Sequence, residues 1–581
     1  TVLSYAVVEY AGERALYLAD SVPVLADVTI ARSALFPVSF GGSAVPDLSR
    51  NVELVDNPFT GIEVRPGTLQ APNVVWPSIK GGDSPLAYVV PGLLRVDEGA
   101  TLDIESGAVV KFWHAPMGQL PGIWVHGLLK AEGVMFTSVY DSAEDAGGAT
   151  YIEAIDPQPG DWGSLTFFES SEKSYLRDVV IRYAGQVRGA VAMQSSSPEL
   201  TRVTITNSAG YPLSADARSF PVLETLTLED NAAGNGLEIY GGLTITGRQT
   251  HVWERLGGST PVVRIIRDTV TVGPDATLKI QPGVVVKFTA QGRVVVQGAL
   301  SAVGGSDPAE QIVLTSVHDD AHGGDTDGPT VPRDNRIWGG IVLEGVDDTT
   351  ELQNVFIRYA PVTLLDAAPK LFSNRIALAP GAGLRMTPGS SPDMRGARFE
   401  DNGLNGIAII SGTLTVDQKW TRLGGAGEDQ IVRVLEGEVT VGPGAVLEIE
   451  SDVVIKASSA GKLTVLGHLR ATGRADQLVV FTSLNDDVRG GDTNRRPLNA
   501  GAGDWPGIEI GPEGNARLAY VSIYYAEVGL NVLGETLPVI DEGRVHIAYG
   551  KQPLACSARV QISPAFFFEY NEIEVTRCPS P

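Results

Sequence analysis

Two aspartate-rich segments are the strongest candidates in the sequence for metal chemistry. One reads Leu314-Thr-Ser-Val-His-Asp-Asp-Ala-His-Gly-Gly-Asp-Thr-Asp327, and the other reads Phe481-Thr-Ser-Leu-Asn-Asp-Asp-Val-Arg-Gly-Gly-Asp-Thr-Asn494. Clustered carboxylates, with glycines that allow tight backbone curvature, suit a hard cation such as calcium. The predicted ligands of a structural calcium site are Asp319, Asp320, Asp325, Asp327, Asp486, Asp487 and Asp492. Aspartate and glycine are also common turn residues, so turns without metal are the alternative.

The same segment occurs a third time in a weaker form. It reads Phe136-Thr-Ser-Val-Tyr-Asp-Ser-Ala-Glu-Asp-Ala-Gly-Gly148 and lacks the Gly-Gly-Asp-Thr ending of the other two. We therefore expect a metal site at this copy less than at the others. None of the three segments has the ligand spacing of an EF-hand.

A tryptophan follows each of these segments. Trp162 and Trp505 come directly after an aspartate, a combination that could form a sugar platform beside a general acid. The middle copy, Trp338, follows Ile337 instead. Because one copy lacks the acid, packing where a long loop rejoins the core explains these rings better than catalysis.

A lysine closes an apolar run before each segment, at Lys111, Lys287 and Lys456. Such a lysine could contact a ligand or act as a catalytic base. A residue repeated in every copy fits a scaffold better, because chemistry seldom needs three equal sites. We expect each stem to lie on the core, with the ammonium in water or paired with a neighbouring carboxylate.

The other motifs of catalysis and cofactor binding indicate no site. The histidines form no His-Glu-x-x-His or similar ligand set, and no phosphate loop, dinucleotide fingerprint or Gly-x-Ser-x-Gly elbow occurs in a suitable context. The sequence therefore assigns no catalytic and no cofactor-binding residue, and an enzyme is the minority interpretation.

These residues recur because the chain is built from long repeats. Trp76, Trp253 and Trp420 lie about 170 residues apart, and the tryptophans and lysines above share this period. A tyrosine-alanine pair keeps the same period, at Tyr10, Tyr183, Tyr359 and Tyr525. The agreement predicts a partial module at 1–75, modules at 76–252, 253–419 and 420–550, and a tail at 551–581.

A shorter rhythm within each module predicts strands. One copy reads Val270-Thr-Val-Gly-Pro-Asp-Ala-Thr-Leu-Lys-Ile-Gln-Pro-Gly-Val-Val-Val-Lys-Phe288, with short alternating apolar runs between tight turns. Alternation indicates strands, and turns this frequent exclude helices of normal length. Three short strands per unit predict a parallel β-helix, in which stacked coils bury one another. At ~22 residues per coil we expect ~26 coils and no helix longer than three turns; a string of β-sandwiches is the alternative.

The repeated unit Thr-Val-x-x-Gly-x-x-Leu-x-Ile-x-x-Gly-x-Val-Val-Lys-Phe resembles that of right-handed parallel β-helix repeat proteins of the pectin-lyase-like superfamily. It is most similar to the secreted or surface-displayed bacterial members. The resemblance covers most of residues 1–550 and implies an all-β, right-handed parallel β-helix (solenoid). For function it is weak, since that superfamily includes polysaccharide lyases and hydrolases, phage tailspikes, adhesins and structural surface proteins.

The composition limits the partners of the chain. Acidic residues outnumber basic residues by 69 to 44, for a net charge of −25. Nucleic acid is a poor partner for such a chain, because phosphate binding needs a basic surface. No apolar run reaches the ~18 residues needed to cross a bilayer.

The cysteines suggest a location. Cys556 and Cys578 are the only two in the chain and both lie near its end. A disulfide between them would close a terminal loop in an oxidising compartment, so we expect an extracellular or cell-surface protein. Two free thiols are the alternative.

The two ends of the chain suggest self-association. The segment 3–12 resembles 518–526, so the chain begins within the module pattern. An uncapped first coil would offer unpaired backbone groups to another strand, and either a preceding segment or another subunit is expected to cover it. The predicted docking surface is the apolar tail at Phe566, Phe567 and Phe568, with an ordinary disulfide-closed cap as the alternative.

Two classes of function remain. The first is a secreted structural or adhesive rod, the subunit of an extracellular filament or surface layer, which binds copies of itself head to tail. The second is a carbohydrate-active enzyme (a polysaccharide lyase or hydrolase) or a β-helix protein that binds cell-surface glycans. A groove with aromatic rings and an acid pair in one module only would favour the second class.

Overall fold

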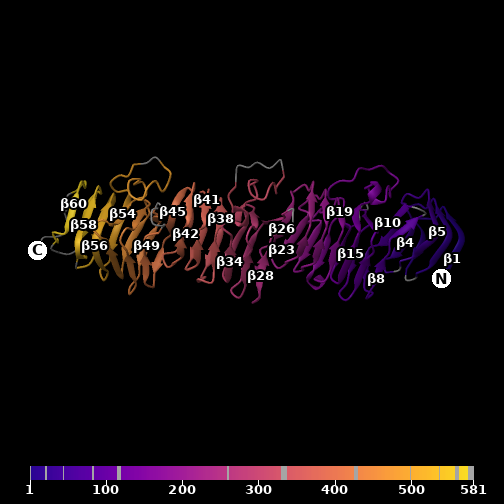
Figure 1. Ribbon diagram of the computed structural model, residues 1–581, viewed down its shortest axis with the longest axis horizontal. Coiled ribbons are helices and arrows are strands. Elements are labelled where there is room, and N and C mark those ends of the chain that lie inside the picture. Colours follow the sequence, from indigo (N-terminus) through magenta and orange to yellow (C-terminus); the bar gives the residue numbers. More distant parts are fainter. Residues whose placement is uncertain are drawn as a thin grey trace.

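The computed structural model describes residues 2–19, 22–43, 45–81, 84–113, 119–257, 261–328, 336–423, 430–496, 499–535, 537–556 and 562–573. These residues form 60 strands and three short 3₁₀-helices, η1 (Glu144–Ala146), η2 (Glu169–Ser171) and η3 (Pro308–Glu310). The strands build one long rod, with β1 (Val2–Glu9) and β60 (Phe566–Glu569) at opposite tips (Figure 1). The predicted all-β chain without long helices is confirmed for this part of the protein.

Three strands make one coil of the rod. β11 (Leu93–Val96), β12 (Thr101–Ile104) and β13 (Val109–Phe112) each pair in parallel with the strand three places further on. Those partners are β14 (Gly122–Val125), β15 (Leu128–Glu132) and β16 (Met135–Ser138). The predicted parallel β-solenoid is therefore confirmed.

The rod has fewer coils than the sequence suggested. It contains about 22 turns, which at a strand spacing of ~4.8 Å correspond to a length of roughly 105 Å. The prediction of ~26 coils divided the whole chain into coils of equal length. That division fails because three long loops lie outside the coils.

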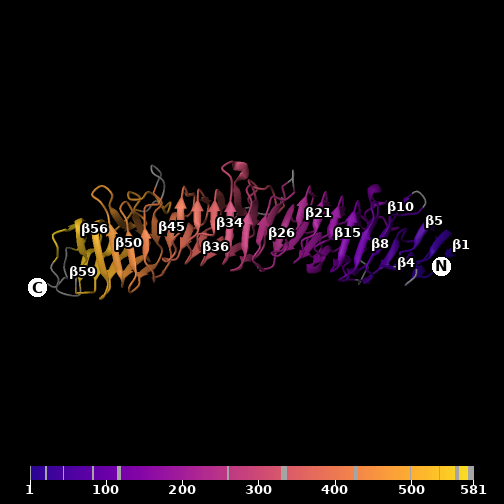
Figure 2. The ribbon, with the colours of Figure 1, turned by 60° about the horizontal axis from the view of Figure 1, so that its bottom comes forward.

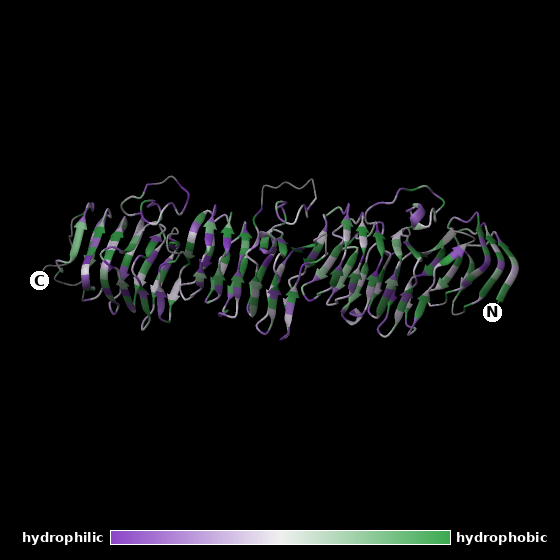
Figure 3. Cartoon of the chain, viewed as in Figure 1, coloured by the Kyte–Doolittle hydropathy of each residue, from purple (hydrophilic) through white to green (hydrophobic). Residues whose placement is uncertain are grey.

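The core is a single stack of inward-facing side chains. In β12, Leu102 and Ile104 are buried, whereas Thr101 and Asp103 are partly exposed. Leu102 lies opposite Leu129 of the next coil, and such pairs continue as one hydrophobic core from Leu18 to Phe566. Figure 3 shows the alternation of apolar and polar residues along the strands. Burying one such side chain stabilises by about 1.5–3 kcal/mol, which a coil gains only when its neighbours cover it.

The repeated tyrosines occupy sharp corners of the coil. Their φ angles are 54° at Tyr10, 61° at Tyr183, 66° at Tyr359 and 60° at Tyr525, all in the left-handed region. Tyr525, for example, separates β56 (Asn515–Tyr524) from β57 (Ala526–Val532). Residues other than glycine seldom adopt this conformation, so it marks fixed corners of the backbone.

Successive modules are offset by one strand. The repeated lysines lie on β13, β32 (Val285–Phe288) and β51 (Val454–Ala457), which are 19 strands apart. Nineteen strands are six coils and one extra strand. The strands that precede the three long loops, β16, β35 (Ile312–Ser316) and β54 (Val479–Ser483), therefore belong to three different sheets.

The three loops nevertheless lie in one line. Figures 1 and 2 both show them on the same long edge of the rod. Because the loops leave three different sheets, the sheets must twist around the rod axis. Between two successive loops, this twist turns each sheet by about one of the three sides of the coil. The rod therefore presents three equivalent loops on one side.

The C-terminal segment continues the stack of coils. β60 pairs in parallel with β58 (Val539–Ala548), and β59 (Gln552–Cys556) pairs with β57. Cys556 ends β59, while Cys578 lies outside the described residues. The disulfide between them stays a prediction.

Candidate functional site

The three long loops carry the residues that the sequence singled out. Loop 1 (139–164) joins β16 to β17 (Leu165–Phe168), and loop 2 (317–340) joins β35 to β36 (Ile341–Glu344). Loop 3 (484–504) joins β54 to β55 (Trp505–Ile510). Residues 329–335 of loop 2 and 497–498 of loop 3 lie outside the described residues.

The three repeated lysines are buried under these loops. Lys111, Lys287 and Lys456 each have 0% of their surface exposed. The Nζ atom of Lys111 donates to the carbonyl oxygens of Asp141 and Gly148, at 2.7 Å each. Lys287 and Lys456 donate to Gly324 and Gly491, which correspond to Gly148. We expected each ammonium in water or paired with a carboxylate. The contacts that the structure describes are to backbone carbonyls instead, because the loop after the next strand folds back over the lysine.

A pair of glycines lets each loop lie against the sheet. Both glycines are left-handed, with φ of 75° and 73° at Gly323 and Gly324 and of 73° and 71° at Gly490 and Gly491. A Cβ on Gly323 would lie 2.7 Å from Cγ2 of Val263. Any side chain there would lift the loop from the sheet and move the carbonyl of the second glycine away from the lysine.

Burial changes the electrostatics of the lysines. Loss of water lowers the pKa of Lys111, Lys287 and Lys456 from 10.5 to about 8, although nearby aspartates oppose the decrease. For Lys287 the opposing carboxylates belong to Asp319, Asp320, Asp325 and Asp327. The ammonium of the lysine beneath the loop therefore already offsets part of the negative charge of these aspartates.

The first aspartate of each loop is bound by protein groups. A threonine hydroxyl donates to Asp141, Asp319 and Asp486 at 2.7, 2.6 and 2.6 Å, respectively. Arg358 also donates to Asp319 at 2.6 Å, and Arg489 donates to Asp486 at 3.1 Å. These carboxylates fix the turn at the start of each loop.

The environment of Asp319 strongly favours its charged form. Burial alone would raise its pKa, but the nearby His322, a hydrogen bond from Thr315 and the charge of Arg358 outweigh burial and lower it to about 2. Arg358 donates to Asp319 and to the Nδ1 atom of His322, at 2.6 Å each. His322 is thus part of this hydrogen-bond network.

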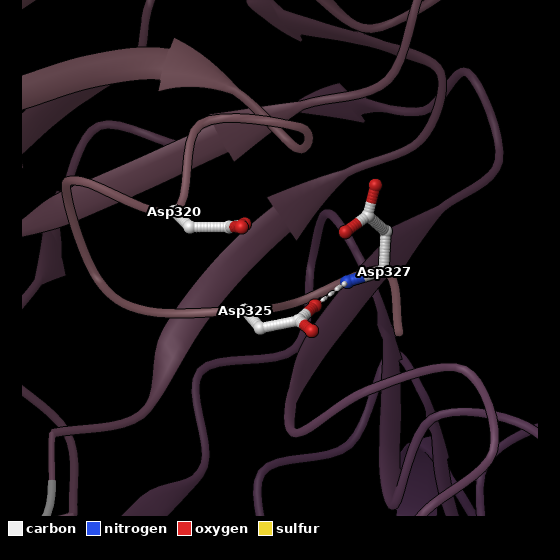
Figure 4. Close-up of side chains that lie close together, drawn as sticks. All are labelled: Asp320, Asp325 and Asp327. Carbon is white, nitrogen blue, oxygen red and sulfur yellow. Dashed lines mark hydrogen bonds between the residues drawn. The ribbon is translucent and has the colours of Figure 1, made fainter. Parts of the chain in front are cut away.

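Three of the seven predicted metal ligands do come together. Carboxylate oxygens of Asp320, Asp325 and Asp327 lie within 4.8 Å of one another (Figure 4). Asp325 accepts from the backbone N–H groups of Asp327 and Gly328, at 3.2 and 2.9 Å. Burial and the neighbouring Asp325 raise the pKa of Asp327, against the influence of His318. In the described part of loop 3, Asp487 and Asp492 form no equivalent group of three carboxylates.

A polar pair closes each of the two loops. In loop 2, Nδ1 of His318 forms a hydrogen bond with a carboxylate oxygen of Asp327. At the corresponding positions of loop 3, Nδ2 of Asn494 donates to Oδ1 of Asn485 at 3.1 Å. Because both pairs connect the same two points of the loop, closing the loop is their common role.

The repeated tryptophans pack at the end of each loop. Trp162, Trp338 and Trp505 are buried, and their Nε1–H groups donate to the carbonyls of Arg182, Arg358 and Tyr524 at 2.7–2.8 Å. Trp162 stacks on Phe112 and Trp338 on Phe288, with ring centroids 4.0 and 3.9 Å apart. The packing interpretation is confirmed, because these rings have no surface to offer a sugar.

An exposed tryptophan lines a cleft in the module at 76–252. Trp124 on β14 is 42% exposed, and its ring lies 5.8 Å from that of Phe168 on β17. Both rings line a cleft of about 430 Å³, together with Leu120, Arg188, Gln194 and Thr166. In the other two modules, the strands that correspond to β14 carry Val295 and Thr464 at the position of Trp124. Sequence reasoning missed this cleft, although Trp124 falls outside both tryptophan series.

No protein-family model and no curated protein matches the sequence. In the described residues, no helix is long and apolar enough to cross a membrane.

Proposed function

We propose that the protein is an extracellular structural or adhesive rod. The observation that carries this proposal is the threefold repetition of one loop design. Each loop has a buried lysine, a glycine pair, a threonine–aspartate bond and a closing tryptophan. These groups use their polar atoms on one another, as a scaffold requires, whereas catalysis needs one set of groups aimed at a substrate.

The rod shape and the acidic charge agree with this role. A continuous core from Leu18 to Phe566 keeps the loops at fixed positions, and a net charge of −25 keeps a long particle dispersed. Membership of the right-handed, pectin-lyase-like superfamily and secretion from a bacterial cell are part of the same proposal. They are supported by the repeated unit and by the cysteine pair near the end of the chain.

Calcium binding at loop 2 is a further part of the proposal. Asp320, Asp325 and Asp327 supply three carboxylates, and a divalent ion would reduce their mutual repulsion. At a hundredfold excess over its Kd, an ion that binds only the folded state stabilises by ~2.7 kcal/mol. We expect a higher melting temperature in calcium than in chelator, and no such difference for Asp325→Asn. The matched control, Asp492→Asn in loop 3, should keep the difference; equal melting of the wild type in both buffers contradicts calcium binding.

The cleft at Trp124 favours glycan binding as a second candidate function. An exposed indole beside Arg188, Gln194 and Thr166 offers an apolar face and hydrogen-bonding groups, a combination that suits a sugar ring. Among the described residues, the corresponding strands of the other two modules carry Val295 and Thr464 in place of Trp124, as expected for a binding site rather than for the scaffold. The two candidates are separated by measuring polysaccharide binding of the wild type and of Trp124→Ala, because only a glycan-binding cleft loses binding on this substitution.

A further inference from the structure

Loop 3 borders a pocket whose equivalent at loop 1 is filled by side chains. The pocket has a volume of about 450 Å³ and lies between the loop, β45 (Leu404–Ile409) and β54, near the C-terminal end of the rod (Figure 1). Its lining includes Leu404 on β45, Ser483 on β54 and Asn485 in the loop. Because one loop design makes both places, the modules at 76–252 and 420–550 can be compared residue by residue.

Aromatic side chains fill this place at loop 1. The five rings belong to Phe36, Phe59, Trp113, Tyr140 and Tyr151. Phe59 is fully buried, and its ring stacks on that of Phe36 with centroids 4.3 Å apart. The centroid of Phe59 also lies 4.9 Å from that of Trp113 and 4.8 Å from that of Tyr151. The rings therefore occupy the space beside this loop.

Two of the corresponding residues follow from the repeated loop segment. Tyr140 and Asn485 directly precede the first aspartate of their loops. Tyr151 and Asn494 each come three residues after the second glycine of the glycine pair. Amide side chains therefore replace both tyrosines in loop 3.

Two more positions belong to the coils against which the loop packs. Phe59 and Leu404 each lie two residues after an asparagine whose Oδ1 accepts from a backbone N–H of the preceding coil at 3.0 Å. Phe36 and Ala382 each lie three residues after the donor of that hydrogen bond. Aliphatic side chains therefore replace both phenylalanines.

The fifth position shows the largest change in size. Two residues after the buried lysine, the module at 76–252 has Trp113 and the module at 420–550 has Ser458. Oγ of Ser458 donates to the carbonyl of Glu436 at 3.1 Å and accepts from the N–H of Ala460 at 3.2 Å. A small hydroxyl group thus stands where the other module has an indole.

All five counterparts of the rings line the pocket. They are Ala382, Leu404, Ser458, Asn485 and Asn494. Each is smaller than the aromatic residue at the same position of the other module. The pocket is therefore the space that five rings take at loop 1 and that the residues of loop 3 leave open.

Hydrogen bonds hold the polar wall of the pocket in place. Nδ2 of Asn485 donates to Asp504 at 3.2 Å, and its Oδ1 accepts from Nδ2 of Asn494 at 3.1 Å. Asp504 also accepts from the hydroxyl of Ser483 at 2.6 Å and from the N–H of Gly501 at 3.2 Å. Within the described part of the chain, these bonds to Asp504 all use its Oδ2 atom, which leaves Oδ1 for a ligand.

The chemistry of the lining suits a neutral sugar. Ala382 and Leu404 form an apolar wall, whereas hydroxyl, amide and carboxylate groups form the rest. Such a mixture fits a ring with apolar C–H groups and with hydroxyl groups that both donate and accept. Among the described lining residues, the carboxylates of Glu436 and Asp504 outnumber the one cation, Arg496, so an anionic ligand fits less well.

We propose that the pocket at loop 3 binds a neutral sugar residue, in the place that aromatic rings take at loop 1. The site is separate from the cleft at Trp124, which lies in the module at 76–252. It adds a binding site to the rod, and the scaffold function stands with or without it.

Filling the pocket tests the proposal. Ser458→Trp, Asn485→Tyr and Asn494→Tyr, combined in one variant, give loop 3 the residues of loop 1. The probes are glucose, galactose, mannose and N-acetylglucosamine, titrated separately in a calorimeter. We expect the wild type to bind at least one of them with a Kd in the millimolar range. The filled variant should bind that sugar at least tenfold more weakly.

A second variant tests the same site without changing its shape. Asp504→Asn replaces the carboxylate by an amide, so an acceptor for sugar hydroxyls is lost, and binding should weaken at least tenfold. The matched control is Asp161→Asn at loop 1, where the aspartate accepts from Ser138 at 2.6 Å beside a filled place. This control and Trp124→Ala should both bind the sugar like the wild type.

Three outcomes overturn the proposal. The first is that the wild type binds none of the four sugars. The second is that Asp504→Asn, or a filled variant that melts like the wild type, keeps the affinity of the wild type. The third is that Trp124→Ala loses binding while the pocket variants keep it, which would place the sugar in the other cleft. None of the three contradicts the scaffold function, which release of cleaved polysaccharide would contradict.

Discussion

Replacing Lys111 by methionine is expected to open loop 1. Methionine has a similar length but no donor, so the carbonyls of Asp141 and Gly148 would be buried without their present partner. Each unsatisfied buried carbonyl costs about 1–3 kcal/mol, so with two carbonyls the free energy of loop opening should fall by about 2–6 kcal/mol. Hydrogen exchange of the amides in 141–148 measures this loss directly. Lys173→Met, at an exposed lysine of the same module, is the control and should leave exchange unchanged.

The pH dependence of loop opening identifies the lysine as the cause. The pKa of Lys111 is about 8 in the folded protein and 10.5 when exposed, so the opened state holds more protons between these pH values. The free energy of opening should therefore rise with pH from 8 to 10.5, by at most roughly 3 kcal/mol. Lys111→Met should lack this rise. A rise of equal size in the variant would show that other groups cause it.

Removing Trp338 should cost more stability than any change at an exposed tryptophan. Its buried ring stacks on Phe288 at 3.9 Å, and its Nε1–H donates to the carbonyl of Arg358 at 2.7 Å. Large-to-alanine substitutions of this kind cost about 3–5 kcal/mol, because they leave a cavity in the core. We expect Trp338→Ala to lower the urea midpoint accordingly, with local unfolding around loop 2.

Trp124→Ala is the matched control for this substitution. Its ring is exposed, so the variant should unfold within about 0.5 kcal/mol of the wild type. Equal losses in both variants would mean that loop 2 is not closed by Trp338. A stable Trp124→Ala protein also provides the variant needed to test the cleft.

The repeat in the sequence predicted the solenoid because its cause is local. Inward-facing residues such as Leu102 and Leu129 must recur once per coil, and corners such as Tyr183 and Tyr359 recur once per module. Any chain with this spacing gains its core by stacking coils. The number of coils was overestimated because the same pattern does not show how many residues a loop withdraws from the stack.

The lysine contacts could not be predicted from the same pattern. Lys111 and Gly148 are 37 residues apart, and their contact depends on the path of loop 1 over the sheet. The sequence did contain a signal, since the lysine and the Gly-Gly pair recur together in all three modules. That the buried lysine lies close to the loop aspartates becomes visible only once the loop is folded, and calcium binding by these aspartates stays a prediction.

The cleft at Trp124 was missed for a different reason. The repeat analysis singled out residues that recur in every module, whereas a binding site needs to occur only once. Trp113 and Trp124 are the two tryptophans outside both repeat series. The first packs against Phe36 and Phe59, whereas the second is exposed, and sequence alone does not separate these environments.

The central claim, that this rod is a scaffold, is tested most directly with polysaccharides. Wild type and Trp124→Ala are each incubated with acidic and neutral polysaccharides, and both product release and binding are measured. We expect no product from either protein, and equal binding or none. Binding that disappears in Trp124→Ala would make glycan recognition the function, and release of cleaved products by the wild type would contradict the scaffold proposal.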